Sequence, residues 1–204
     1  PEAMITVYAN VMEHGGLKPH ETLLVHGGAS GIGSMAIQMA KVFGAKVITT
    51  VSSQNKADAC KSFGADYIIN YKEKDFVAEV KAFTDDSGAD VILDMVGGDY
   101  IQRNIQCAAK GGRIINIGYM NGFSAEVNFL QVMLKNLTLT GSTLRARPVA
   151  EKARLTQRVG EEFWPLTPEK IKPVIYKTFP LEQAGAAQTL MESNAHIGKI
   201  ILTN

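Results

Sequence analysis

The sequence predicts an α/β protein built on a doubly wound, six-stranded parallel sheet. One observation is an apolar segment, Leu23 to Val25, followed by a glycine-rich turn and then by apolar residues at helical spacing. Another is a glycine followed by a short apolar group at Gly44, Gly64, Gly88 and Gly112. These glycines lie about 20 to 24 residues apart, which is room for one strand and one helix. Alternating strands and helices of this length need right-handed crossovers, which give a parallel sheet covered on both faces.

The individual elements follow from local patterns. Apolar residues at helical spacing predict a helix at the start of the chain, and Gly15 to Pro19 is a turn into the first strand. Beyond Thr143 the alternation ends, and Pro165 and Pro168 are expected to end the long helix there. The predicted strands of the sheet are Leu23 to His26, Lys46 to Val51, Tyr67 to Asn70, Val91 to Met95, Arg113 to Ile117 and Leu137 to Gly141. The tail is predicted as a helix from Arg145 to Phe163, an extended segment from Ile171 to Phe179, a helix from Leu181 to Ser193 and a strand from Lys199 to Leu202.

Composition narrows the class of protein. The 204 residues carry a formal net charge of +1, which provides no broad field for nucleic acid or an anionic membrane. The absence of a long apolar run or a signal peptide predicts a soluble cytoplasmic protein. Cys60 and Cys107 fall in separate predicted helices, which argues against a zinc site. Pro1 begins a helix without a preceding cap, so we expect the chain to be a fragment of a longer protein.

The turn from His26 to Gly33 predicts a phosphate cradle. Glycines let the backbone approach a pyrophosphate closely, and the free N–H groups at the start of the next helix favour its negative charge. Because this turn follows the first strand of an alternating α/β chain, we interpret the domain as a dinucleotide-binding (Rossmann) fold. We expect His26 to be a hydrogen-bonded residue at the strand end, and Asp94 to accept backbone hydrogen bonds.

The end of the second strand predicts NADP(H) rather than NAD(H). An acidic residue there would bind the ribose 2′-OH and repel a 2′-phosphate. The sequence from Thr50 to Lys56 contains no Asp or Glu, and Ser52, Ser53 and Lys56 offer hydrogen bonds and a positive charge instead.

The glycine spacing also fits the short-chain dehydrogenases. Those enzymes need a tyrosine followed four residues later by a lysine, which lowers the pKa of the phenol for proton transfer. None of the six tyrosines has a lysine at that position, so this alternative falls.

Short motifs along the whole chain carry a more specific resemblance. They are Pro1-Glu2-Ala3, Leu17-Lys18-Pro19, His26 to Gly33, Ala40-Lys41-x-x-Gly44-Ala45, Ile69-Asn70-Tyr71, Gly141-Ser142-Thr143-Leu144-Arg145 and Ile197-Gly198-Lys199-Ile200. With these motifs the chain resembles the zinc-free NADPH:quinone oxidoreductases of the medium-chain dehydrogenase/reductase superfamily. The resemblance implies a dinucleotide-binding domain over residues 1–144, and over 145–204 the returning part of a catalytic domain whose GroES-like portion is missing from this chain.

The resemblance also implies roles for individual residues. Ser30 stands where a glycine is common in the family, which bears on how closely the backbone meets the phosphate. No catalytic acid is assigned, and no metal is expected. The implied cofactor-binding residues are Thr6 at the nicotinamide end, Ser30, Gly31, Ile32 and Gly33 at the pyrophosphate, Ser52, Lys56 and Tyr71 around the 2′-phosphate and adenosine, Gly118, Tyr119, Met120 and Asn121 at the nicotinamide ribose, and Leu144, Arg145 and Lys199 beside them.

The expected chemistry is hydride transfer from NADPH to a quinone or a conjugated enone, since no zinc is present to polarise an isolated carbonyl. An enoyl-thioester reductase of the same superfamily and a non-enzymatic NADPH-binding sensor remain alternatives. We expect a small-molecule substrate, no nucleic-acid or membrane partner, little turnover by the fragment alone, and a homodimer through the sheet edge at 137–141.

Overall fold

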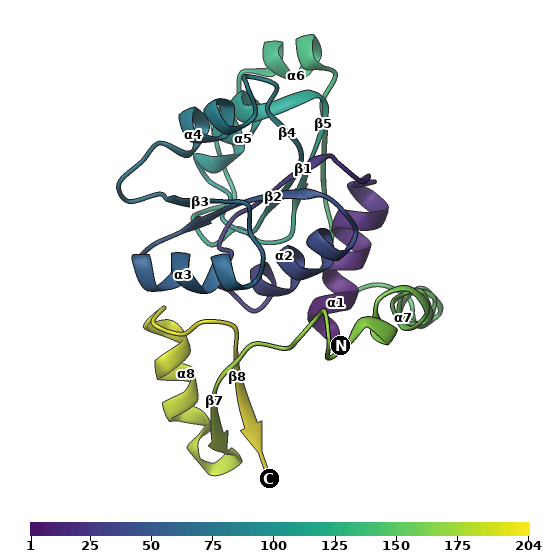
Figure 1. The fold of residues 1–204 in the computed structure, drawn as a ribbon, viewed down its shortest axis with the longest axis vertical. Helices are drawn as coiled ribbons and strands as arrows, with labels where there is room; N and C mark the ends of the chain where they lie inside the picture. Colours follow the sequence, from purple (N-terminus) through teal and green to yellow (C-terminus); the bar gives the residue numbers. More distant parts are fainter.

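The computed structural model describes residues 1–204 and shows an α/β architecture with one six-stranded parallel sheet, as predicted (Figure 1). The strands lie in the order β3-β2-β1-β4-β5-β6. The first strand therefore lies in the middle of the sheet. β2 and β3 are added on one side of β1, and β4, β5 and β6 are added on the other, so the strand order reverses between β1 and β4. The strands are β1 (Thr22–Val25), β2 (Lys46–Val51), β3 (Tyr67–Asn70), β4 (Ala89–Asp94), β5 (Ala108–Asn116) and β6 (Thr138–Gly141).

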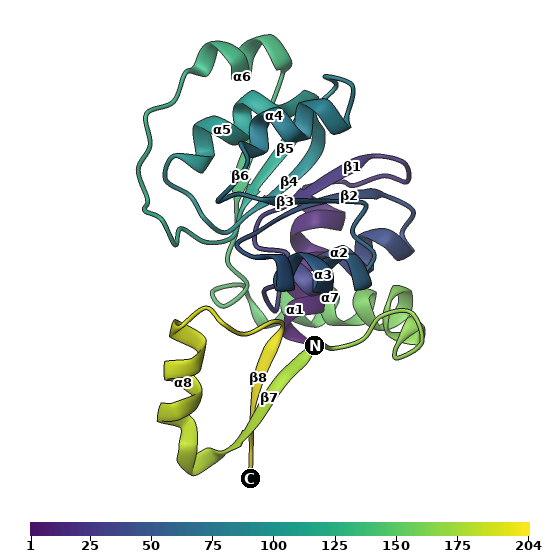
Figure 2. The ribbon, with the colours of Figure 1, turned by 60° about the vertical axis from the view of Figure 1, so that its left-hand side comes forward.

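Helices cover both faces of this sheet (Figure 2). Alternate residues of one strand point to opposite faces, so Leu23 and Val25 join one buried cluster while Leu24 joins the other. The first face carries α1 (Glu2–Val7), the π-helix η1 (Tyr8–His14), α2 (Gly33–Val42), α3 (Gln54–Ser62) and α7 (Val149–Glu162), and the second carries α4 (Phe76–Phe83), α5 (Tyr100–Cys107) and α6 (Phe129–Lys135).

The C-terminal segment forms a smaller unit that projects from the main body. Strands β7 (Ile175–Pro180) and β8 (Lys199–Thr203) pair in parallel, and between them run the short 3-10 turn η3 (Leu181–Gln183) and helix α8 (Ala184–Glu192). The preceding part of the chain, which contains α7 and the 3-10 turn η2 (Trp164–Leu166), packs on the main body. Its side chains Leu155, Val159 and Ile171 are buried in the core on the first face of the main sheet. The proposed division at residue 144 remains a prediction.

Two helical expectations need correction. The predicted helix from Arg145 begins only at Val149, because Pro148 takes an extended conformation at the N-cap position. It ends at Glu162, and Pro165 lies in the 3-10 turn that follows. The opening helix changes after Val7 into a π-helix. No helix combines the length and apolar character that a bilayer crossing requires.

Candidate functional site

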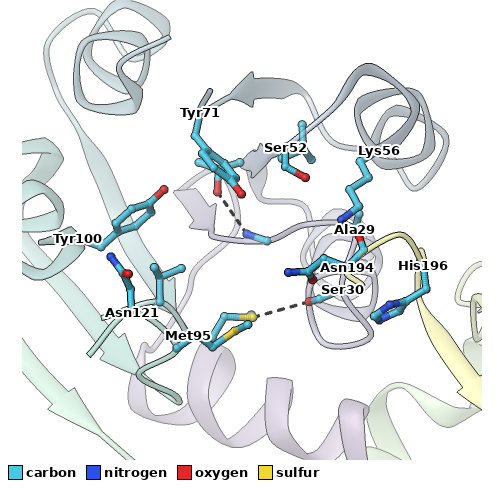
Figure 3. A pocket seen from close by; sticks show the side chains of 15 residues that line it. Ala29, Ser30, Ser52, Lys56, Tyr71, Met95, Tyr100, Asn121, Asn194 and His196 are labelled. Atoms are coloured by element: carbon cyan, nitrogen blue, oxygen red, sulfur yellow. Dashed lines mark hydrogen bonds between the residues drawn. The ribbon is translucent and has the colours of Figure 1, made fainter. Parts of the chain in front are cut away.

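A cavity of about 440 Å³ lies at the carboxyl ends of the strands, beside the point where the strand order reverses. Ligands of open α/β sheets bind at this position because the loops that follow neighbouring strands diverge there. No Asp or Glu lines the cavity (Figure 3). Its walls are formed by Gly27, Ala29, Ser30, Thr50, Val51, Ser52, Lys56, Tyr71, Met95, Val96, Tyr100, Met120, Asn121, Asn194 and His196.

The glycine turn is held in a conformation that other residues would not fit. Gly27 has a φ of 68°, in the left-handed region that favours glycine. A Cβ on Gly33 would lie 2.3 Å from the Gly27 carbonyl oxygen, so α2 packs directly on the turn. Gly31 differs, because a Cβ there would meet only the flexible end of Lys199.

Ser30 supplies a structural contact within the turn. Its Oγ accepts a hydrogen bond of 2.9 Å from the Gly33 N–H. One of the free N–H groups at the start of α2 is therefore already satisfied. Ser30 also lines the cavity, and its Oγ lies 3.7 Å from the Met95 sulfur.

A buried network of polar side chains holds the start of the glycine turn in place. His26 Nε2 lies 2.7 Å from Asn104 Oδ1, and His26 Nδ1 lies 3.1 Å from Thr50 Oγ1, which accepts the Gly27 N–H. Asn104 and Asn116 both donate to Asp94 Oδ2. Burial lowers the pKa of His26, and the charge of Asp94 opposes that shift. Because the Asn104 side-chain nitrogen donates to Asp94, the side-chain oxygen of Asn104 is the acceptor that faces His26 Nε2–H.

Both carboxylate oxygens of Asp94 are occupied by hydrogen bonds within the protein. Its Oδ1 accepts hydrogen bonds from the backbone N–H groups of Val96 and Gly97 at 2.7 and 3.2 Å, and its Oδ2 is bonded to both asparagines. The expectations that Asp94 accepts backbone hydrogen bonds and that His26 is a hydrogen-bonded residue at the strand end are both confirmed.

The structure brings Ser52, Lys56 and Tyr71 together at one end of the cavity. Ser53 caps α3 by accepting the Lys56 N–H, which places the Lys56 side chain on the first turn of that helix. The Lys56 amine donates a hydrogen bond of 2.6 Å to the Asn194 carbonyl. Burial, and then the charge of Lys72, lower the pKa of Lys56 below its ordinary value.

The remaining predicted residues divide into groups. Met120 and Asn121 line the cavity, whereas Gly118, Tyr119, Ile32 and Gly33 do not. Thr6 and Lys199 both contact the Glu2 carboxylate: the Thr6 hydroxyl donates to it at 2.8 Å, and the Lys199 amine lies 4.0 Å from it. The Lys199 side chain also lies over Gly31.

The segment after β6 lies outside the cavity. Leu144 packs against the core of the first sheet face. Arg145 is exposed, and its carbonyl accepts a hydrogen bond from Lys152. The structure does not bring either side chain to the cavity lining.

Five cavity residues escaped the sequence analysis: Met95, Val96 and Tyr100 beyond β4, and Asn194 and His196 in the C-terminal segment. Asn194 and His196 belong to the segment between α8 and β8, which reaches the glycine turn through a hydrogen bond from the Gly198 N–H to the Ala29 carbonyl. The motif from Ile197 to Ile200 lies directly beside them and was the one available signal.

Comparison with known proteins places this architecture in a family. The sequence profile of the family described as zinc-binding dehydrogenase matches residues 31–159. The chain belongs to the zinc-binding dehydrogenase family. This family forms part of the medium-chain dehydrogenase/reductase superfamily that the sequence motifs indicated, and the Rossmann-type sheet agrees with it.

Individual relatives are similar over nearly the whole chain. Quinone oxidoreductase 1 of Escherichia coli is 32% identical over 205 residues, which cover 97% of this chain and 61% of that protein. The structure of E. coli quinone oxidoreductase complexed with NADPH has a TM-score of 0.87 at 30% identity, with 99% of this chain and 63% of that chain covered. The structure of CurK enoyl reductase has a TM-score of 0.83 at 25% identity, covering 100% of this chain and 61% of that chain. The chain spans less than two thirds of the curated relatives that it matches.

The family description names zinc. Zinc sites in proteins take three or four ligands from Cys, His, Asp and Glu. No group of three such residues is placed to hold a metal ion. Cys60 and Cys107 are buried in different helices, and burial raises the pKa of each thiol to about 12.

Proposed function

We propose that this chain is the NADPH-binding part of an oxidoreductase. The observation that carries the proposal is the cavity itself, which joins a glycine turn to Lys56 and His196 and contains no carboxylate. A pocket with basic groups and no carboxylate suits an anion such as the 2′-phosphate. It lacks the acidic side chain that would accept a hydrogen bond from the free ribose 2′-OH of NADH. The NADPH complex of the E. coli relative supports the same cofactor.

In this proposal each wall of the cavity has a distinct task. The turn at Ser30 to Gly33 receives the pyrophosphate, because its backbone can approach closely and α2 presents its positive end there. Ser52, Lys56 and Tyr71 hold the 2′-phosphate and the adenosine. Residues 118–121 orient the nicotinamide ribose, and Thr6, Leu144, Arg145 and Lys199 border the nicotinamide end.

The proposed reaction is hydride transfer to a quinone or a conjugated enone. The bound nicotinamide supplies the hydride. The chain's own residues contribute binding and orientation, since the distance and angle to the acceptor account for much of the rate in such reactions. The proposed acceptor takes its negative charge on a conjugated oxygen, which needs no zinc, and water provides the proton.

An enoyl-thioester reductase is the second candidate. The similarity to CurK enoyl reductase favours it, and such a thioester is also a conjugated acceptor. An acceptor panel assayed with NADPH on the full-length protein separates the candidates: a quinone, an enone, an enoyl thioester and an unconjugated aldehyde. Oxidation of NADPH by the first two supports the proposal, and oxidation by the thioester alone supports the second candidate. Reduction of the aldehyde alone would contradict both.

We also propose that the protein forms a homodimer through β6. This strand lies at the edge of the sheet, and α6, which precedes it in the chain, has no buried residue and exposes Phe129, Met133 and Leu134. An unpaired strand edge flanked by apolar side chains is suited to continuing the sheet into a second copy.

A further inference from the structure

The segment between α8 and β8 forms one wall of the cavity although it is distant in sequence from the rest. Asn194 and Gly198 both have positive φ, at 57° and 77°, so the chain turns sharply at each end of the segment. The Gly198 N–H is bonded to the Ala29 carbonyl at 2.8 Å, and the Lys56 amine to the Asn194 carbonyl at 2.6 Å. The segment is thus fixed to the glycine turn at one end and to α3 at the other.

His196 lies in this segment with a side chain that has no hydrogen-bond partner. Its Nδ1 is enclosed and has no hydrogen-bond partner. Buried imidazoles usually satisfy their nitrogens, as His26 does through Thr50 and Asn104. His196 lines the cavity, and Nδ1 is the only one of its two ring nitrogens that is enclosed without a partner, so we consider Nε2 as the nitrogen open to a ligand.

The charges around His196 favour an anion. Lys56 faces it from α3, and the other titratable groups lining the cavity are the phenols of Tyr71 and Tyr100. Figure 3 shows Lys56, Asn194 and His196 on one side of the cavity, with Tyr100 and Asn121 on the opposite side. Burial, and then the charge of Lys56, lower the pKa of His196. A bound anion would offset the repulsion between these two basic groups.

We propose that His196 is a specificity-determining residue, which donates through Nε2 to the 2′-phosphate of the cofactor and shares that phosphate with Lys56. This inference rests on the proposed NADPH function and adds a residue from the C-terminal segment to its phosphate site. The cofactor choice would then depend on the tail as well as on the end of β2.

The test measures the dissociation constants of NADPH and NADH for the full chain by calorimetry. His196→Leu removes the donor at similar size, and His196→Gln keeps a neutral donor. His14→Leu, an exposed histidine on η1, is the matched control. The leucine variant should weaken NADPH binding roughly 10- to 100-fold, as expected for a hydrogen bond to a charged group, and leave NADH binding unchanged. The glutamine variant should recover part of the loss.

Three results would count against the inference in distinguishable ways. If His196→Leu keeps the wild-type preference for NADPH, His196 does not read the phosphate, while the proposed function stands. If it weakens both cofactors equally, the residue acts only on the structure of the loop. If the wild-type chain binds NADPH no more tightly than NADH, the proposed cofactor fails and this inference fails with it.

Discussion

Replacing Lys56 by methionine removes one positive charge from the cavity and nearly preserves the length of the side chain. The proposed role of Lys56 is to face the 2′-phosphate, which NADH lacks. The variant should therefore weaken NADPH binding and leave NADH binding nearly unchanged. It also breaks the hydrogen bond from the Lys56 amine to the Asn194 carbonyl.

The size of the effect follows from where the amine lies. Two unit charges about 4 Å apart interact by about 1 kcal/mol in water and by about 4 kcal/mol near a protein surface. Lys56 is half-buried, and its amine already donates to a carbonyl, so we expect a value between these limits. A loss of about 2 kcal/mol corresponds to a roughly 30-fold weaker affinity for NADPH. Lys56→Asp should cost more, because it adds a repelled charge.

The assay is a titration of each variant with both cofactors, followed by the fluorescence of the reduced nicotinamide. Lys61→Met, at an exposed position on the same helix, is the matched control and should bind both cofactors like the wild type. Thermal unfolding of each variant reports on loosening of the 194–198 segment. An equal loss of affinity for NADPH and NADH, or no loss for either, would refute the assignment of Lys56 to the phosphate.

Three further predictions concern the turn, a buried histidine and the sheet edge. Gly33→Ala should abolish cofactor binding or destabilise the fold, because a Cβ at position 33 meets rigid backbone. Gly31→Ala should be far milder, because a Cβ at position 31 meets only the movable end of Lys199. Equal effects of the two variants on cofactor binding and thermal unfolding would contradict this. Since burial lowers the pKa of His26, the unfolded chain takes up a proton below about pH 6.5 that the folded chain does not. The free energy of unfolding should therefore fall as the pH drops from about 7.5 to about 5.5, and His196, whose pKa is also lowered, adds in the same direction. A free energy of unfolding that urea denaturation shows to be independent of pH would contradict this. Leu139→Lys on β6 should convert a dimer to a monomer in sedimentation experiments, and a wild-type chain that stays monomeric at high concentration would contradict the proposed pairing.

The strands could be predicted from sequence because their signals are local. A glycine that ends each helix and a short apolar group after it located β2 and β3 at their observed bounds, and β1, β4 and β6 within two residues. The start of β5 at Ala108 was missed, since Lys110 to Gly112 interrupts the apolar pattern that the prediction relied on. The start of α7 was also placed too early, although Pro148 carried a readable signal.

The candidate site was only partly accessible to sequence reasoning. Ser30, Ser52 and Lys56 follow the first two strands directly, and parallel strands bring their carboxyl ends to one edge. His196 reaches the same cavity through packing of the tail on the glycine turn, a contact between residues far apart in sequence to which only the neighbouring motif from Ile197 to Ile200 pointed. The roles of the individual site residues remain predictions.

The most direct test of the proposed function is a calorimetric comparison of NADPH and NADH binding to the wild-type chain. The arrangement of the glycine turn, Lys56 and His196 predicts that both cofactors bind and that NADPH binds more tightly, with the difference carried by the 2′-phosphate. Equal affinities, or tighter binding of NADH, would contradict the proposal that this cavity is built for the phosphorylated cofactor.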